Sequence, residues 1–278
     1  MPRQSPRPGP ASEPAPAPPP EDPPRPTAPP RPGPARRSGR QQRAAAPGRR
    51  SYAQYCGAAR ALDVVGDRWA LLIVRELLAG ARRYTDLHAD LPGVSTDMLA
   101  ARLKDLERDG IVTRRRLSPP AAAFVYQLTD RGRLLLPVLQ ALADWGAADL
   151  GERRPTDAVR AHWFALPLRA RLTELGGTGV AEVHLDEGVF HVWAGSPADP
   201  APPGGDLPAG SADAPPAEGV PVYGDGPAPG VPDARLRLDA ATCTALATGA
   251  LTVPDAVRTG RLTVTGDGPL AKTVRGDA

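Results

Sequence analysis

The chain has 278 residues, enough for about two ordinary domains, and a formal net charge of +3, a weak excess of base. It contains 36 prolines and 29 glycines but only two cysteines, too few for a disulfide framework. No stretch approaches the roughly 18 uninterrupted apolar residues of a membrane span, and no N-terminal apolar run suggests a secretory signal. These features predict a cytoplasmic protein without a membrane partner.

Residues 1–50 hold nearly half of the prolines, many arginines and almost no large apolar side chains. They cannot bury a core, so we expect a disordered N-terminal arm rich in proline and arginine. Because its arginines outnumber its acids, the arm would be able to touch DNA phosphates without sequence preference. The alternatives are a tail without a role and a start codon assigned too far upstream.

Ordered elements are predicted from Tyr52 onward. Apolar residues at helical spacing predict a helix over residues 59–80. A second, short helix is predicted over 84–91, with Thr85 as its N-cap. After a tight turn, Ser95 is expected to cap a third helix.

The next stretch alternates between basic and apolar residues. Strands over 112–117 and 124–128, joined by a turn that contains proline, predict a β-hairpin. Thr129 is then expected to cap a further helix that runs to Leu150, with a kink at Pro137. The predicted order is helix, helix, turn, helix, hairpin, helix.

The helix after Ser95 has two distinct faces. At about 100° per residue, Leu99, Leu103 and Leu106 fall on one stripe. The opposite face is small at first and basic further on, which suits a helix whose N-terminal half enters the major groove. The hairpin would be a wing with arginines directed at phosphate or the minor groove. The residues expected to contact double-stranded DNA are Ser95, Thr96, Asp97, Ala100, Ala101, Lys104, Arg108, Arg114, Arg115 and Arg116.

The alternative for each of these features alone is a solvated basic helix and hairpin; their order and spacing together favour DNA binding. The same residues resemble a known family, the HxlR-type winged-helix regulators of bacteria. The matching stretches are ARALDVVGDRWALLIVRELLAGARRYTDL, LPGVSTDMLAARLKDLERDGIVTRR and VYQLTDRGRLLLPVLQALADWG. The resemblance implies a winged helix-turn-helix domain, here residues 51–152, in a homodimeric transcriptional regulator.

In that family the terminal helices commonly build the dimer, which here means the regions 55–80 and 132–150. The residues expected at the two-fold interface are Leu135, Leu139, Leu142 and Trp145. Cys56 precedes the first helix, where some relatives have a cysteine that senses oxidants or electrophiles. A helix N-terminus lowers the pKa of a thiol, and Arg60 would assist, which makes Cys56 a redox candidate; the alternative is a half-buried packing residue.

Residues 156–278 are predicted to form an α+β domain with a low-complexity insertion at 195–230. The pattern of strand, helix, short helix and strand after the insertion resembles the end of sterol-carrier-protein-like domains. That resemblance implies an apolar tunnel and, as an effector, an apolar small molecule. The side chains that would either line such a cavity or simply fill a core are Leu236, Leu238, Leu246, Leu251, Val253, Val257, Leu262 and Val264.

No set of side chains indicates catalysis, a cofactor or a metal ion. His184 and His191 flank one hairpin turn, but two imidazoles alone make a poor metal site. The sequence therefore predicts a DNA-binding regulator that is not an enzyme, with an overall α+β fold. The alternative is a carrier of lipids or other hydrophobic ligands whose N-terminal domain serves mainly for dimerisation. The basic wing argues against that alternative.

Overall fold

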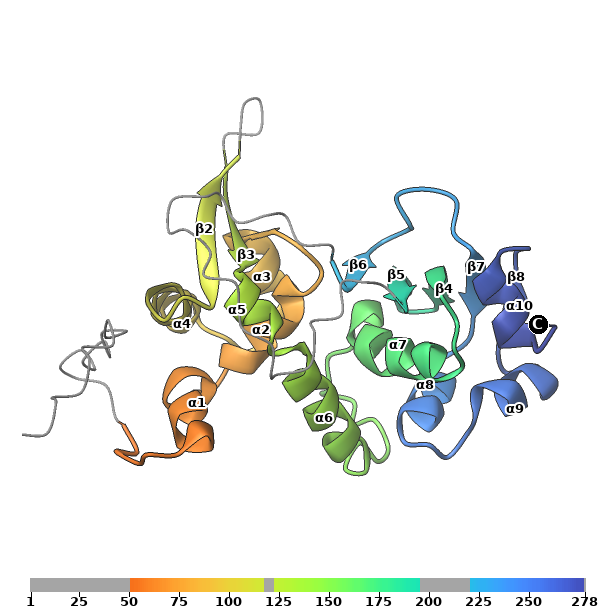
Figure 1. The fold of residues 1–278 in the computed structure, drawn as a ribbon, viewed down its shortest axis with the longest axis horizontal. Helices are drawn as coiled ribbons and strands as arrows, with labels where there is room; N and C mark the ends of the chain where they lie inside the picture. Colours follow the sequence, from red (N-terminus) through yellow and green to blue (C-terminus); the bar gives the residue numbers. More distant parts are fainter. Residues whose placement is uncertain (1–50, 118–122, 196–220, 278) are drawn as a thin grey trace, which may run out of the picture. The chain divides into compact units, whose positions relative to one another are not determined.

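The computed structural model describes residues 51–117, 123–195 and 221–277, which belong to one compact unit (Figure 1). The predicted N-terminal arm, the turn of the hairpin and most of the predicted insertion lie outside the described residues. We call residues 51–152 the N-terminal part and residues 156–277 the C-terminal part. In the described residues, no helix is both long and apolar enough to cross a membrane.

The N-terminal part is a winged helix-turn-helix. Its three-stranded sheet has the order β1-β3-β2, with both neighbouring pairs antiparallel. Helix α4 follows α3 after a short turn, and the β2–β3 hairpin follows α4 (Figure 1). The elements are α1 (Gly57–Val65), α2 (Ala70–Leu77), β1 (Arg82–Arg83), α3 (Tyr84–Asp90), α4 (Thr96–Arg108), β2 (Val112–Arg116), β3 (Phe124–Leu128), α5 (Asp130–Arg133) and α6 (Leu136–Ala147).

The prediction of a single helix over 59–80 is wrong, because the helix is interrupted between α1 and α2. Trp69 takes a left-handed backbone conformation with φ of +78°, which a continuous helix does not allow. The backbone N–H of Ala70 donates to the carbonyl of Asp67, at 3.1 Å, and starts the second helix. The apolar stripe continues across this break, so periodicity alone does not reveal it.

Capping side chains explain where several of the other helices begin. The Ser95 hydroxyl accepts from the N–H of Met98 at 3.3 Å, and the Thr129 hydroxyl accepts from the N–H of Gly132 at 3.1 Å, so both predicted caps are confirmed. The predicted cap at Thr85 is wrong. With Thr85 as N-cap, α3 would begin at Asp86. It begins two residues earlier, at Tyr84, and its N-cap is Arg83.

The predicted helix from Thr129 to Leu150 is two helices, α5 and α6. The break falls just before Pro137, which lies in the first turn of α6. Proline has no N–H to donate and its ring clashes with the carbonyl four residues earlier, so the helix cannot run through this point. The predicted kink is therefore a complete break.

The C-terminal part has the expected mixture of helices and strands. A five-stranded sheet has the order β6-β5-β4-β7-β8, in which only β4 and β7 are parallel among these pairs. The elements are η1 (Ala161–Phe164), α7 (Ala165–Glu174), β4 (Gly179–Leu185), β5 (Gly188–Ala194), β6 (Tyr223–Asp225), β7 (Ala234–Arg237), α8 (Ala240–Ala247), α9 (Val253–Arg258), β8 (Thr263–Thr265) and α10 (Pro269–Arg275).

Strand β6 lies inside the predicted insertion, so the predicted end of that insertion at residue 230 is wrong. Tyr223 is only 1% exposed and β6 pairs with β5. Three residues are too few to stand out in a stretch rich in proline and glycine, which is why the sequence pattern missed them. The likeness to sterol-carrier domains stays a prediction.

One cluster of buried side chains runs through both parts. Of the apolar residues proposed to line a cavity or fill a core, Leu236, Leu238, Leu246, Val253 and Leu262 are buried in this cluster. The other three are partly buried and pack against it. Burial of this kind is expected for a filled core and for the wall of a cavity alike, so the apolar effector stays a prediction.

Candidate nucleic-acid interface

Helix α4 has the two faces that its sequence predicts. Leu99, Leu103 and Leu106 are at most 1% exposed, so the stripe anchors the helix in the core. The opposite face lies at the surface. Its exposed residues include Ser95, Thr96, Asp97, Ala100, Ala101 and Lys104. Met98, which the sequence argument did not single out, is also 42% exposed in the first turn.

The supporting helix α3 is tied to the first turn of α4. The Tyr84 hydroxyl donates to the carbonyl of Thr96 at 2.8 Å. Burial raises the pKa of Tyr84, and the nearby charge of Asp97 raises it further, so this hydroxyl keeps its proton. The hydrogen bond fixes the N-terminal end of α4, which is the end that would face base edges.

Arg102 and Arg108, both on α4, are engaged within the protein. Arg102 pairs with Asp67, between α1 and α2, and so holds α4 against the other helices. Arg108 pairs with Asp105 at 2.8 Å and with Asp109 at 3.5 Å. The positive charge of Arg108 is thus partly balanced, so Lys104 is the stronger candidate for a basic contact to DNA on this helix.

The wing strand β2 presents its arginines on two faces. Arg114 and Arg116 are exposed, whereas Arg115 is partly buried and its Nε donates to Gln127 Oε1 at 3.3 Å. The guanidinium of Arg114 stacks on the Phe124 ring, 3.9 Å from its centroid. Two of the three arginines therefore face outward, and Arg115 mainly ties the two strands of the wing together.

The four residues expected at a dimer interface do not share one free surface. Leu139 is 7% exposed and belongs to the core of its own chain, and Leu135 packs against that core. This face of α6 is covered largely from within the chain, so the place of these two residues at a dimer interface stays a prediction. Leu142 and Trp145 are 44% and 77% exposed, and Val138, one turn earlier on the same face, is 44% exposed.

A second apolar surface lies on and before α1. Tyr55 is fully exposed and Leu62 is 50% exposed, while only Ala59 and Val65 of α1 are buried. A helix that buries so little of its apolar surface in its own chain usually has a partner. This surface falls in the first of the two regions that the family resemblance assigns to the dimer.

Cys56 is exposed and occupies the N-cap position of α1. The pKa of its thiol is lowered by hydrogen bonds from the backbone N–H groups of Ala59 and Ala58. Arg60, the expected helper, pairs with Asp63 at 3.5 Å. Cys243 is buried, and burial raises the pKa of its thiol to about 12.

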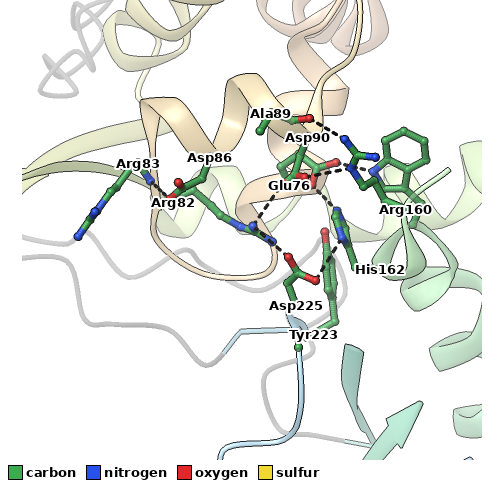
Figure 2. Close-up of polar contacts among 12 residues, drawn as sticks. Glu76, Arg82, Arg83, Asp86, Ala89, Asp90, Arg160, His162, Tyr223 and Asp225 are labelled. Carbon is green, nitrogen blue, oxygen red and sulfur yellow. Dashed lines mark hydrogen bonds and ion pairs between the residues drawn. The ribbon is translucent and has the colours of Figure 1, made fainter. Parts of the chain in front are cut away.

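A buried carboxylate that the sequence pattern does not predict joins the N-terminal part to the C-terminal part. Glu76 on α2 is 0% exposed. Figure 2 shows it beside His162. Its carboxylate accepts from Arg75 Nε at 2.8 Å and from Trp163 Nε1 at 3.1 Å, and lies 2.8 Å from His162 Nε2. Burial opposes the charged form, but His162 and Arg75 outweigh it, so the pKa of Glu76 lies below its ordinary value.

The end of α3 joins the same network. Asp90 pairs with Arg82 at 3.1 Å and with Arg160 at 3.5 Å (Figure 2). Burial raises the pKa of Asp90 above its ordinary value. The one sequence signal for this network is an acid within the apolar run WALLIVRELLA, and its partners lie far along the chain.

The N-terminal part also has recognisable relatives. Residues 64–154 match the model of the HxlR-like helix-turn-helix family. The uncharacterized HTH-type transcriptional regulator YvaP of Bacillus subtilis is 38% identical over 86 residues, which are 31% of this chain and 80% of YvaP. The chain belongs to the HxlR-like helix-turn-helix family.

A second regulator of the same organism is also similar to this chain. The HTH-type transcriptional regulator YodB of Bacillus subtilis is 36% identical over 85 residues, 31% of this chain and 76% of YodB. The solved structure of its reduced form is 33% identical, covers 37% of this chain and 100% of that chain, and has a TM-score of 0.31. The family model ends at residue 154, so it does not extend over the C-terminal part.

We predict that the two thiols differ sharply in alkylation. In native protein, Cys56 should react quickly with iodoacetamide, and the midpoint of its pH–rate profile should lie below that of an ordinary thiol because backbone hydrogen bonds stabilise the thiolate. Cys243 should react only on unfolding. Mass spectrometry of peptides after timed labelling checks this; equal labelling, or a midpoint above the ordinary value, would contradict it.

Proposed function

We propose that this protein is a dimeric, sequence-specific transcriptional regulator that reads double-stranded DNA with α4. The observation that carries the proposal is the capped, leucine-anchored α4 with a small and basic outer face, followed by a wing with outward-facing Arg114 and Arg116. Membership of the HxlR-like family supports the same function. A lipid carrier would have no use for these basic groups.

In this proposal the N-terminal half of α4 enters the major groove. Thr96, Asp97, Ala100 and Ala101 lie at the surface of that half, where small side chains let the helix backbone approach the bases. Lys104, one turn further on, would bind phosphate. Base contacts near the N-terminus would supply specificity, while the phosphate contact would set position and register.

The wing would hold the flank of the site. Because Arg114 stacks on Phe124, its guanidinium is oriented before DNA arrives, which reduces the entropy lost on binding. Arg116 is exposed on the same face of β2. Both guanidinium groups suit a phosphate or a narrow minor groove.

A homodimer would use the exposed face of α6, with Val138, Leu142 and Trp145, together with the apolar surface at Tyr55 and Leu62. Two copies of α4 would then meet half-sites about 34–36 Å apart along the DNA. Two finer proposals depend on this dimer. Oxidation of Cys56 and an apolar effector in the C-terminal part would each act by favouring one arrangement of the two copies.

We predict that Arg116→Ala weakens binding to the preferred DNA and to random DNA about equally. Loss of one phosphate contact should also lower the slope of log affinity against log salt by roughly one. Arg258→Ala is the matched control, because it removes the same charge from an exposed arginine on α9. Fluorescence anisotropy at several salt concentrations measures both quantities. An unchanged slope for both Arg114→Ala and Arg116→Ala would refute the wing assignment.

We also predict that Trp145→Glu gives monomers, because a buried, unpaired carboxylate opposes association. Binding should fall to the strength of a single half-site. Val231→Glu is the control, since Val231 is a 93% exposed apolar residue outside α6 and should not change the assembly. Sedimentation velocity reports the mass, and circular dichroism reports the fold. A folded Trp145→Glu variant that remains dimeric counts against this interface.

A further inference from the structure

The C-terminal part binds the end of the supporting helix α3 through Arg160. Arg160 Nη2 donates to the carbonyl of Ala89 at 3.1 Å, and Arg160 Nε lies 3.5 Å from Asp90 Oδ1 (Figure 2). Ala89 and Asp90 are the last two residues of α3, and the turn that leads to Ser95 and α4 follows directly. Arg160 therefore holds the chain at the entry to the helix-turn-helix turn.

The C-terminal part also contacts α2, the helix against which α3 and α4 pack. Glu76 is bound by His162 and Trp163, as described above. The Tyr223 hydroxyl donates to the carbonyl of Arg75 at 2.8 Å, beside this carboxylate. The backbone N–H of Val222 donates to the carbonyl of Leu78 at 2.9 Å. These contacts fix the frame on which α4 lies.

We call the place where the C-terminal part contacts α2 and α3 the junction. Its charged side chains form an ion-pair network. Three acids, Glu76, Asp90 and Asp225, meet three arginines, Arg75, Arg82 and Arg160. Glu76, Asp90 and His162 bring ligand atoms within 4.8 Å of one another, as a metal site would. A divalent cation would nevertheless add two charges to a group that the arginines already balance, and neighbouring cations would repel it.

The network is not fully satisfied. Arg82 Nη2 is buried without a hydrogen-bond partner among the described residues. A buried donor without a partner costs free energy, so the arrangement seen here is stabilised by the surrounding ion pairs and hydrogen bonds and not by Arg82 Nη2. A rearrangement that gave Arg82 Nη2 a partner would recover that free energy.

We propose that this junction is an intramolecular clamp through which the C-terminal part sets the DNA affinity of α4. In the closed state Arg160 fixes the end of α3 and thereby the turn before α4. A ligand or modification that moves Arg160 or Trp163 releases that turn and weakens DNA binding. Arg160 is a positioning residue in this scheme and does not touch DNA. The proposal rests on the proposed function, since only a DNA-reading helix has an affinity to be set.

The test compares Arg160→Ala with Arg154→Ala in the full-length protein. Both variants lose one positive charge from the same connecting segment, but Arg154 is exposed and, among the described residues, pairs locally with Asp157 at 3.1 Å. Three quantities are measured for each: affinity for DNA selected by the wild-type protein, the salt slope of that affinity, and amide hydrogen exchange over residues 89–99. Arg160→Lys is the conservative variant.

Arg160→Ala should lower affinity about fivefold or more, in the range of ordinary coupling between sites. Its salt slope should stay that of the wild type, because no phosphate contact is lost. Exchange should quicken over residues 89–99 while the urea midpoint of global unfolding changes little. Arg154→Ala should match the wild type throughout, and Arg160→Lys should restore part of the affinity because its ammonium still pairs with Asp90.

Three results would overturn the clamp. One is equal affinity and exchange in Arg160→Ala and Arg154→Ala. Another is a salt slope lowered by about one without faster exchange, which would make Arg160 a phosphate contact. The third is added Zn²⁺ that raises the unfolding midpoint of the wild type but not of Glu76→Gln, which would make the junction a metal site. A wild-type protein that selects no DNA would instead refute the proposed function.

Discussion

The structure depends on a buried negative charge that residues of both parts stabilise. Glu76 is fully buried, and two of its partners, His162 and Trp163, come from the C-terminal part. A chain that ended at residue 150 would lose both of these partners and would keep Arg75 as the ion-pair partner of the carboxylate. The two parts are therefore joined by the polar contacts of Glu76 as well as by their continuous core.

This constraint connects the fold to the proposed DNA reading. Glu76 fixes α2, and α2 supports α3 and α4. The Tyr84 hydroxyl then joins α3 to the first turn of α4. A displacement of the C-terminal part would thus pass to α4 through packed elements and hydrogen bonds, without a new contact to DNA. By that route the C-terminal part would influence the position of α4, although the family model covers only residues 64–154.

Local chemistry was predictable from the sequence, and distant pairing was not. The Ser95 cap, the leucine stripe of α4 and the alternation of the wing arginines all depend on residues a few positions apart. The partners of Glu76 lie 86 and 87 residues away, so no local pattern identifies them. The inward face of α6 is ambiguous in the sequence for a related reason: Leu139 is apolar enough for either a dimer or a core, and only packing against distant elements decides between them.

We expect the two parts to unfold as one unit, because they share Glu76 and a continuous core. Amide hydrogen exchange, measured by mass spectrometry along a urea titration, tests it most directly. Peptides from α4 and from the β4–β5 hairpin should lose protection at the same urea concentration, as in a two-state transition. Loss of protection in one part at a clearly lower urea concentration than in the other would contradict the account.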